Sequence, residues 1–148
     1  MSVFIDEPKN VQAQFIFAHG AGAGAESEFM IRFAKELTRY GIRVIRFNFP
    51  YMIKIAEEGK RRPPDKMPKL EEAFITAINK NKSTIPTFIG GKSMGSRVAV
   101  HVADLCDVAG VICLGYPFHP QNKPEKLRLE ALQKLKKIHL FCRENGTN

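Results

Sequence analysis

The sequence predicts an α/β fold in three layers, with a mainly parallel sheet of about five strands and helices on both of its faces. Short apolar segments alternate along the chain with segments in which apolar residues recur at helical spacing. The apolar segments are continuous runs, which is typical of strands that are buried on both faces. With 148 residues and no internal repeat, the chain is expected to form a single domain over residues 1–148.

The first part of the chain predicts two strands and a helix. Residues 11–18 (VQAQFIFA) form a short apolar run that predicts the first strand, and a glycine-rich loop follows it. Residues 27–41 predict a helix, with Ser27 as a cap at its start and Gly41 at its end. Its apolar face comprises Phe29, Phe33, Leu37 and Tyr40. Residues 42–49 (IRVIRFNF) predict the second strand.

An irregular segment interrupts the alternation before the third strand. Residues 50–68 have no clean period and contain two adjacent prolines, so we expect one helical turn at most, near residues 53–58. Residues 70–79 predict a helix. Its inner face comprises Leu70, Ala73, Phe74, Ala77 and Ile78. Residues 85–90 (IPTFIG) predict the third strand.

The last part of the chain predicts two more helices and two more strands. The helix after the third strand has an inner face that comprises Met94, Val98, Val102 and Leu105. Residues 108–116 (VAGVICLGY) predict the fourth strand. A helix is expected from Pro124 to about Leu135, since proline suits the first helical turn. Residues 137–141 (KIHLF) predict the fifth strand.

Composition argues against several classes of protein. Hydrophobic residues make up 44% and charged residues 26%, and no apolar run reaches the ~18 residues of a membrane-spanning helix. The first ten residues lack the features of a secretory signal, so we expect a cytoplasmic protein that does not bind membranes. Cys106, Cys113 and Cys142 have no metal-ligand spacing and are expected to be reduced thiols. No metal and no other cofactor are expected.

The formal net charge of +8 includes a cluster of basic residues at Lys60, Arg61 and Arg62. Such a cluster can attract nucleic acid or an anionic substrate. No nucleic-acid-binding motif accompanies it, and aromatic residues are not interleaved with the charges. We therefore expect a solvated loop and no nucleic-acid partner.

The stretch GGKSMG allows two interpretations. Residues 91–93 (GKS) match the end of a phosphate-binding loop, but that loop requires a glycine five residues before Gly91, where Pro86 stands. The same stretch matches G-x-S-x-G, the turn that presents a nucleophilic serine between a strand and a helix. The predicted strand and helix on either side favour the second interpretation. Ser93 is then the candidate nucleophile, and Gly91 and Gly95 are the small residues that the turn requires.

Acyl transfer also requires an oxyanion hole, and the sequence offers two backbone donors. The Met94 N–H directly follows the serine, and the loop after the first strand (AHGAGAG) offers the Ala21 N–H. That loop has a rival interpretation, because residues 20–25 match the G-x-G-x-x-G/A fingerprint of dinucleotide-binding proteins. The fingerprint requires an acidic residue at the end of the next strand, where Asn48 stands, and it leaves Ser93 unexplained.

The motifs AHGAGAG, RFNFPYM, RRPPD, GGKSMGSR and LGYPFHPQNKPEKLR occur in the order and at the spacings of one family. The chain resembles the predicted α/β-hydrolases related to dienelactone hydrolase, which include a testis-expressed protein and a subunit of a histone-acetylating NSL complex. The resemblance runs from about Phe15 to Leu135, although Ser96 stands where many relatives have glycine. It implies a sheet flanked by helices, with Ser93 as the nucleophile. It also implies Met94 and Ala21 as oxyanion donors, and by fold analogy an ester or other small acyl substrate.

The same resemblance reveals a gap in the expected triad. In these hydrolases the acid follows the next-to-last strand and the histidine comes later. Here the strand that should precede the acid leads into FCRENGTN, with Glu144 or Asn145 near the place of the acid. One codon choice for FCRENGTN, read from its third base, gives LQGERDK, which contains the Gln-Gly-x-x-Asp stretch of the relatives. We therefore expect an incomplete α/β-hydrolase fold that lacks the C-terminal strand and helix, either truncated or frameshifted.

No histidine of the chain is expected to replace the missing base. His19 belongs to the oxyanion loop, and His101 lies on the helix after the serine, on its outer side by prediction. His139 lies within the last strand. His119, in YPFHP, is a candidate for lining the mouth of the site, in the wrong loop for the base. We expect little or no activity, and an exposed sheet edge at the last strand.

Two functions are compatible with these features. The first is a serine hydrolase that acts on a carboxylic ester or another small acyl substrate. The second is a non-catalytic interaction module that keeps the fold as a scaffold, with the basic cluster at residues 60–62 as its contact surface.

Overall fold

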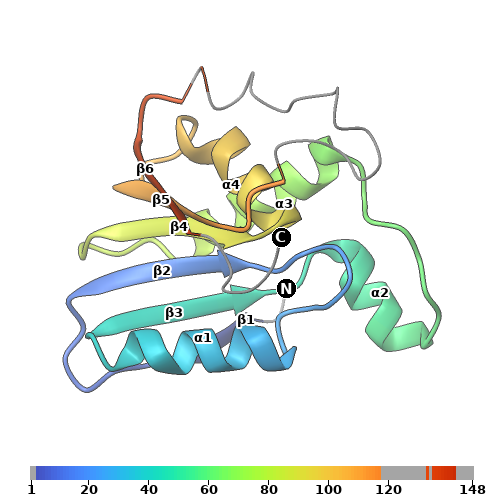
Figure 1. The fold of residues 1–148 in the computed structure, drawn as a ribbon, viewed down its shortest axis with the longest axis horizontal. Helices are drawn as coiled ribbons and strands as arrows, with labels where there is room; N and C mark the ends of the chain where they lie inside the picture. The colour runs from blue at the N-terminus through green and yellow to red at the C-terminus, as the bar shows by residue number, and fades with distance from the viewer. Residues whose placement is uncertain (1–2, 118–132, 134, 143–148) are drawn as a thin grey trace.

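The computed structural model of the chain describes residues 3–117, 133 and 135–142. These residues form a six-stranded sheet with the strand order β1-β3-β2-β4-β5-β6 (Figure 1). The strands are β1 (Val3–Asp6), β2 (Ala13–Ala18), β3 (Ile42–Phe47), β4 (Thr87–Lys92), β5 (Gly110–Leu114) and β6 (Ile138–Cys142). Only β1 runs antiparallel to its neighbour. The predicted mainly parallel sheet is confirmed.

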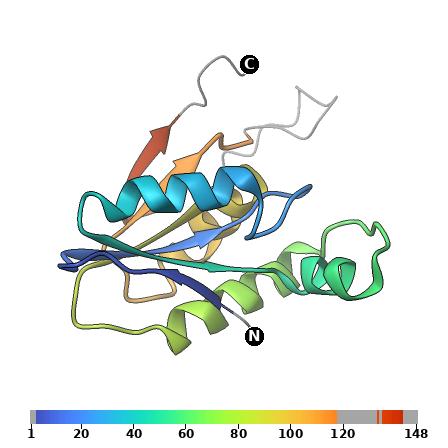
Figure 2. The same ribbon diagram turned by 90° about the horizontal axis from the view of Figure 1, so that it is seen from below.

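Helices cover both faces of the sheet and complete the three predicted layers. Those in the described part of the chain are α1 (Glu28–Thr38), α2 (Pro50–Glu58), α3 (Met67–Lys80) and α4 (Met94–Ala103). Helix α1 lies on one face, and α3 and α4 lie on the other (Figure 2). Helix α2 lies beyond the carboxyl ends of β2 and β3 (Figure 1). None of the helices described here is both long and apolar enough to cross a membrane.

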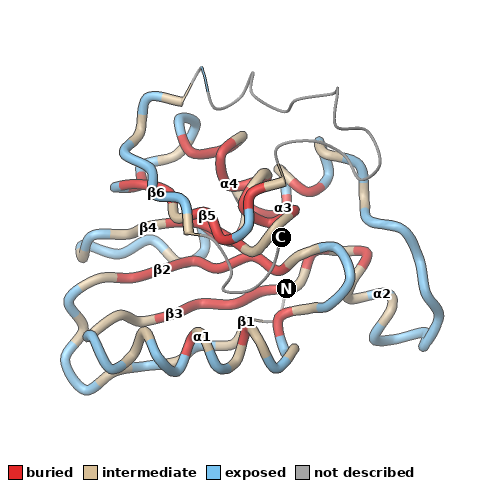
Figure 3. The backbone as a smooth tube through the Cα atoms, in the orientation of Figure 1, coloured by how far each residue is buried: buried red, intermediate tan, exposed pale blue. Residues whose placement is uncertain are grey.

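The central strand β2 separates two apolar cores. Phe15 and Phe17 pack against α1, whereas Ile16 and Ala18 contribute to the larger core under α3 and α4. Because successive strand residues point to opposite faces, a strand segment between two cores is apolar on both faces, as residues 15–18 of β2 are. Figure 3 shows this burial along the central strands. The continuous apolar run in the sequence therefore correctly predicted a strand that is buried on both faces.

The expected ends of α1 are largely confirmed. The Ser27 hydroxyl accepts a hydrogen bond from the Met30 N–H at 3.4 Å, and Gly41 has a φ of +79° just beyond the helix. Two residues assigned to inner helical faces are exposed instead, namely Tyr40 and Leu105. Both residues lie beyond the end of their helix, since α1 ends at Thr38 and α4 ends at Ala103.

The prediction of an irregular segment after β3 was wrong in part, because only residues 59–66 of that segment lack a helix or strand. Residues 50–58 form the nine-residue helix α2, which has Pro50 in its first turn and ends at Gly59 in the left-handed conformation. Tyr51 is its one fully buried side chain, so α2 lacks the continuous apolar face that reveals a helix in sequence. Helix α3 begins at Met67, three residues before the predicted start.

Strand β1 was missed and lies at one edge of the sheet, antiparallel to β3. Four residues are too few to show a clear period in sequence. At the opposite edge, the exposure predicted for the last strand is confirmed. Ile138 of β6 is 79% exposed and Leu140 is 57% exposed. The helix expected between Pro124 and Leu135 lies almost wholly outside the described residues.

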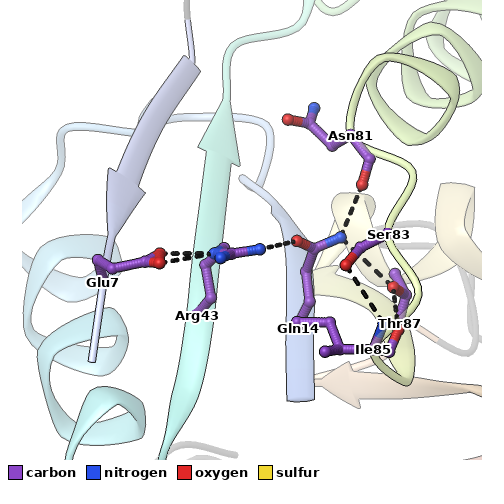
Figure 4. Close-up of polar contacts among 7 residues, drawn as sticks. All are labelled: Glu7, Gln14, Arg43, Asn81, Ser83, Ile85 and Thr87. Atoms are coloured by element: carbon purple, nitrogen blue, oxygen red, sulfur yellow. Dashed lines mark hydrogen bonds and ion pairs between the residues drawn. The ribbon is translucent and has the colours of Figure 1, made fainter. Parts of the chain in front are cut away.

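A chain of polar side chains ties together the amino ends of the parallel strands (Figure 4). Arg43 of β3 bonds to both Glu7 carboxylate oxygens and donates to the Gln14 amide oxygen at 3.1 Å. The Gln14 amide nitrogen donates to the Asn81 carbonyl at 2.7 Å and lies 3.3 Å from the Thr87 hydroxyl. All polar atoms of the buried Gln14 side chain are thus satisfied, which indicates a structural role at this end of the sheet.

Candidate active site

The strand order brings two loops together at the carboxyl edge of the sheet. The chain passes from β2 to β3 on one side, and then returns to β4 on the other side of β2. Loops that diverge in this way form a topological switch point, where open α/β sheets bind ligands. Residues 19–25 follow β2, and Ser93 follows β4. The register pairs Ala18 with Gly91, so the two loops leave the sheet side by side.

Ser93 links β4 directly to α4 in a strained backbone conformation. Its φ is 54° and its ψ is −115°. Among the described residues it is the only non-glycine residue with a positive φ. Such conformations cost on the order of 1–3 kcal/mol and persist only where the surrounding structure enforces them. The Ser93 N–H donates to the Leu114 carbonyl of β5 at 2.7 Å, which fixes the turn to the neighbouring strand.

Gly91 and Gly95 flank the turn where no side chain has room. A Cβ atom on Gly91 would lie 2.4 Å from the carbonyl carbon of Gly95. A Cβ atom on Gly95 would lie 2.5 Å from the His19 carbonyl oxygen and 2.7 Å from that of Ala18. Both contacts involve backbone, which cannot move aside cheaply. The glycines of G-x-S-x-G therefore permit helix α4 to start directly against β2.

Ser96 fits this turn although many relatives carry glycine at its position. The side chain is fully buried, and its hydroxyl donates to the Ser93 carbonyl at 2.6 Å. The Ser96 N–H reaches the same carbonyl at 3.0 Å. The departure from the family pattern thus adds a hydrogen bond to the turn.

The loop after β2 lies directly against the serine. A Cβ atom on Gly20 would stand 3.6 Å from the Ser93 Cβ and 3.2 Å from the Lys92 carbonyl oxygen. Within the described part of the chain, neither the Ala21 N–H nor the Met94 N–H donates a hydrogen bond. Among the described residues, neither predicted oxyanion donor is thus committed to another acceptor. Met94 also lies at the N-terminus of α4, where the helix dipole favours negative charge.

His19 is a buried, neutral residue of this loop. Its Nδ1 lies 2.6 Å from the Gly20 carbonyl, and its Nε2 lies 3.0 Å from the Phe49 N–H. The Phe49 N–H can only donate and the Gly20 carbonyl can only accept, so the proton is on Nδ1. Burial lowers the pKa of His19 to about 4, although the Gly20 hydrogen bond opposes this shift. Both ring nitrogens are engaged with backbone, which indicates a structural role for His19.

The other histidines in the described part of the chain are also engaged away from Ser93. Nδ1 of His101 lies 3.4 Å from a Glu71 carboxylate oxygen, so His101 faces helix α3 and not the outer side that the sequence predicted. Nδ1 of His139 lies 3.0 Å from the Lys137 carbonyl on the exposed edge strand. His119, Glu144 and Asn145 lie outside the described residues. The described residues therefore bring the predicted nucleophile close to the loop of the predicted oxyanion donors, and none of their imidazoles is placed as a base.

The geometry argues against a phosphate-binding loop at residues 91–93 and against a dinucleotide-binding loop at residues 20–25. The Lys92 ammonium lies 4.3 Å from the centre of the Phe29 ring on α1, on the sheet face rather than over the loop. The Asn48 side chain accepts a hydrogen bond from the Ala25 N–H at 2.8 Å, so it closes the loop where a dinucleotide site needs a free acid. Both polar groups have structural roles instead.

Comparison with known proteins identifies the family of the chain. A family model described as an alpha/beta hydrolase domain matches residues 11–147. The chain belongs to the α/β-hydrolase domain family. The six-stranded, mostly parallel sheet and four helices of the described residues form a partial α/β-hydrolase fold.

Solved structures share the fold of this α/β-hydrolase. A dienelactone hydrolase from Anabaena variabilis matches with a TM-score of 0.73 at 19% identity, over 95% of this chain and 66% of that one. A Xanthomonas campestris serine hydrolase without a lid matches at 0.67 and 18% identity, over 98% and 78% of the two chains. A serine hydrolase homologue from Coxiella burnetii matches at 0.67 and 18% identity, over 95% and 66%. The present chain thus spans just under two thirds of the length of the first and third of these structures.

Sequence reasoning missed the residues that support the loop after β2. Tyr51 donates a hydrogen bond from its hydroxyl to the Ala21 carbonyl at 2.9 Å, and Asp65 accepts one from the Tyr51 N–H at 2.8 Å. Both residues belong to motifs, RFNFPYM and RRPPD, that supported the resemblance without a chemical role. Their partners lie far away in sequence, so spacing alone could not reveal these contacts.

Proposed function

We propose that the chain is a serine hydrolase in which Ser93 attacks the carbonyl carbon of a carboxylic ester or another small acyl substrate. The observation that carries the proposal is the strained Ser93 backbone between Gly91 and Gly95, where a side chain would collide with backbone. Strain of this kind presents the hydroxyl above the sheet. The Ala21 and Met94 N–H groups are the proposed donors to the oxyanion.

In the proposed reaction, the Ser93 oxygen bonds to the carbonyl carbon and the carbonyl oxygen becomes an oxyanion. The hydroxyl proton passes to water, and the oxyanion collapses as the bond from the carbonyl carbon to the leaving oxygen breaks. The leaving oxygen takes up a proton and departs as the alcohol. Water then releases the acid from the acyl-enzyme. No imidazole in the described part of the chain is placed to accept the proton, so we expect slow turnover. His119 is kept as a proposed residue at the mouth of the site.

The substrate class rests on the chemistry of the site and on its relatives. One structural neighbour is a dienelactone hydrolase. A lactone is a cyclic carboxylic ester, which agrees with attack by a serine beside two backbone donors. We propose a small acyl compound as the partner and the cytoplasm as the location.

Labelling with a fluorophosphonate tests whether Ser93 is the reactive serine. In this reaction the serine oxygen bonds to phosphorus and fluoride leaves, so the site can be found by peptide mass spectrometry. We expect slow labelling that is confined to Ser93 and absent from Ser93→Ala. The matched control is Ser83→Ala, which removes an exposed serine from the loop before β4 and should label like the parent.

Two outcomes would contradict the proposal. Equal labelling of the parent and Ser93→Ala would remove Ser93 from the reaction. Labelling as fast as that of a complete serine hydrolase would contradict the expected lack of a base, because loss of triad members reduces rates by several orders of magnitude.

A second candidate function is a non-catalytic interaction module. It is favoured by the exposed basic cluster of Lys60, Arg61 and Arg62 between α2 and α3. In that cluster Arg62 pairs with Glu58 at 2.9 Å. Reversal of the charges of Lys60 and Arg61 should remove bound partners in a pull-down from cell extract. Unchanged partners would leave this second function without support.

A further inference from the structure

The Tyr51 side chain connects helix α2 to the loop that holds the proposed oxyanion donor. Tyr51 is only 1% exposed. Its hydroxyl lies 2.9 Å from the Ala21 carbonyl oxygen and 3.3 Å from the Gly20 carbonyl oxygen. Since carbonyl oxygens only accept, the hydroxyl is the donor in both contacts. A buried hydroxyl is thereby directed at the two carbonyl groups on either side of the Ala21 N–H.

These contacts determine how the Ala21 N–H is oriented. The Gly20 carbonyl and the Ala21 N–H belong to the same peptide group, and in a trans peptide they point in opposite directions. His19 and Tyr51 both bond to the carbonyl side of this peptide group. The N–H must then point away from the two rings. Because Tyr51 also holds the following carbonyl, rotation on both sides of Ala21 is restricted.

Tyr51 itself is held in one position. Its backbone N–H donates to the Asp65 carboxylate at 2.8 Å, and its ring packs edge-on against the His19 ring at a centroid distance of 5.9 Å. Burial, and then the charge of Asp65, raise the pKa of the Tyr51 hydroxyl. The hydroxyl therefore keeps its proton and remains a donor over the physiological pH range.

We propose that Tyr51 is a positioning residue for acyl transfer, whose hydroxyl orients the Ala21 N–H toward the oxyanion that forms at Ser93. The proposal rests on the proposed function, since it concerns the donor side of the same site. It also assigns a role to the motifs RFNFPYM and RRPPD, which supply Tyr51 and the Asp65 that anchors it. Ala21 is exposed, and among the described residues only the Tyr51 side chain donates a hydrogen bond to its carbonyl. The Tyr51 hydroxyl is therefore the contact to remove.

The test is Tyr51→Phe in the full chain, which removes one oxygen and keeps the ring packed against His19. The matched control is Tyr40→Phe, which makes the same change at a tyrosine that is 73% exposed. We measure fluorophosphonate labelling of Ser93 as a function of probe concentration. Loss of an oxyanion donor costs about 10²–10³ in rate, and a misdirected donor should cost about tenfold or more. We expect that loss in the rate at saturating probe, with the probe affinity unchanged.

A second measurement does not depend on a reaction at Ser93. The ¹⁵N order parameter of the Ala21 amide reports the restriction of the loop on the ps–ns timescale. We expect it to fall in Tyr51→Phe and to stay at the parent value in Tyr40→Phe, with the melting temperature of both variants near that of the parent. A parental labelling rate in Tyr51→Phe, or an unchanged Ala21 order parameter, would overturn the inference.

The two proposals can fail separately. If the parent and Ser93→Ala label equally, the proposed function fails and the order parameter alone decides whether Tyr51 restrains Ala21. If Ser93 labels specifically but Tyr51→Phe labels at the parental rate, the proposed function stands and the positioning role is refuted.

Discussion

At the scale of single residues, the turn around Ser93 depends on two neighbours that have no side chain. The serine adopts a φ of 54° because Gly91 and Gly95 let the start of α4 contact the backbone of β2. The motif G-x-S-x-G could be found in the sequence because these requirements fall within five adjacent residues. Tyr51, Asn48 and Asp65 could not be found in this way, because each bonds to a residue 14 to 30 positions away.

Gly95→Ala tests the close approach directly. The added Cβ would lie 2.5 Å from the His19 carbonyl oxygen, so β2 or α4 must shift. We expect a loss of about 3 kcal/mol or more in the free energy of unfolding, measured by urea denaturation. Gly22→Ala is the matched control, since a Cβ there meets nothing within 4 Å and the change should be neutral or slightly stabilising. Equal effects of the two substitutions would contradict the tight turn.

His19 predicts a pH dependence of stability. Its pKa falls from 6.5 in a model peptide to about 4 in the fold. A depressed histidine pKa means that the unfolded chain binds the proton more tightly, so stability is complete above pH 6.5 and is lost as the pH falls toward 4. This group should remove about 3 kcal/mol from the free energy of unfolding between pH 7 and pH 4. His19→Asn should be less stable at pH 7 and should lack this component. An unchanged pH slope in the variant would refute the assignment.

At the scale of elements, sequence periodicity predicted those that pack on both sides or along one continuous face. Strands β2 to β5 and helices α1, α3 and α4 belong to this group. Helix α2 and strand β1 do not, because α2 buries only Tyr51 fully and β1 has four residues at an edge. Helix α2, which supports the proposed oxyanion loop, is therefore one of the two elements that periodicity failed to predict in full.

Strand β6 leaves an apolar edge in contact with solvent, and such edges promote pairing between chains. We expect the parent to self-associate as its concentration rises, and Leu140→Lys to reduce this in sedimentation velocity. The matched control is Tyr40→Lys, at an apolar residue that is 73% exposed just after α1, a helix that packs on β3 in the other half of the sheet. A parent that stays monomeric at all concentrations, or equal effects of the two substitutions, would contradict the prediction.

At the scale of the whole molecule, the alternation of strands and helices predicted a three-layer α/β fold, and the structure confirms it. The order of the strands in the sheet could not be read from the alternation, because that order depends on which side of β2 each crossover takes. It is this order that places the loops after β2 and β4 at one switch point. The proposed nucleophile and its oxyanion donors thus come together through the topology.

The most direct test of Ser93 as the acylated residue is intact mass spectrometry during reaction with 4-nitrophenyl acetate. If Ser93 attacks and no imidazole speeds its deacylation, a single acetyl group should accumulate on the chain. Peptide mapping should locate this group at Ser93, and Ser93→Ala should remain unmodified at the site. Acetylation spread over surface lysines alone, with no difference between the parent and Ser93→Ala, would contradict the account.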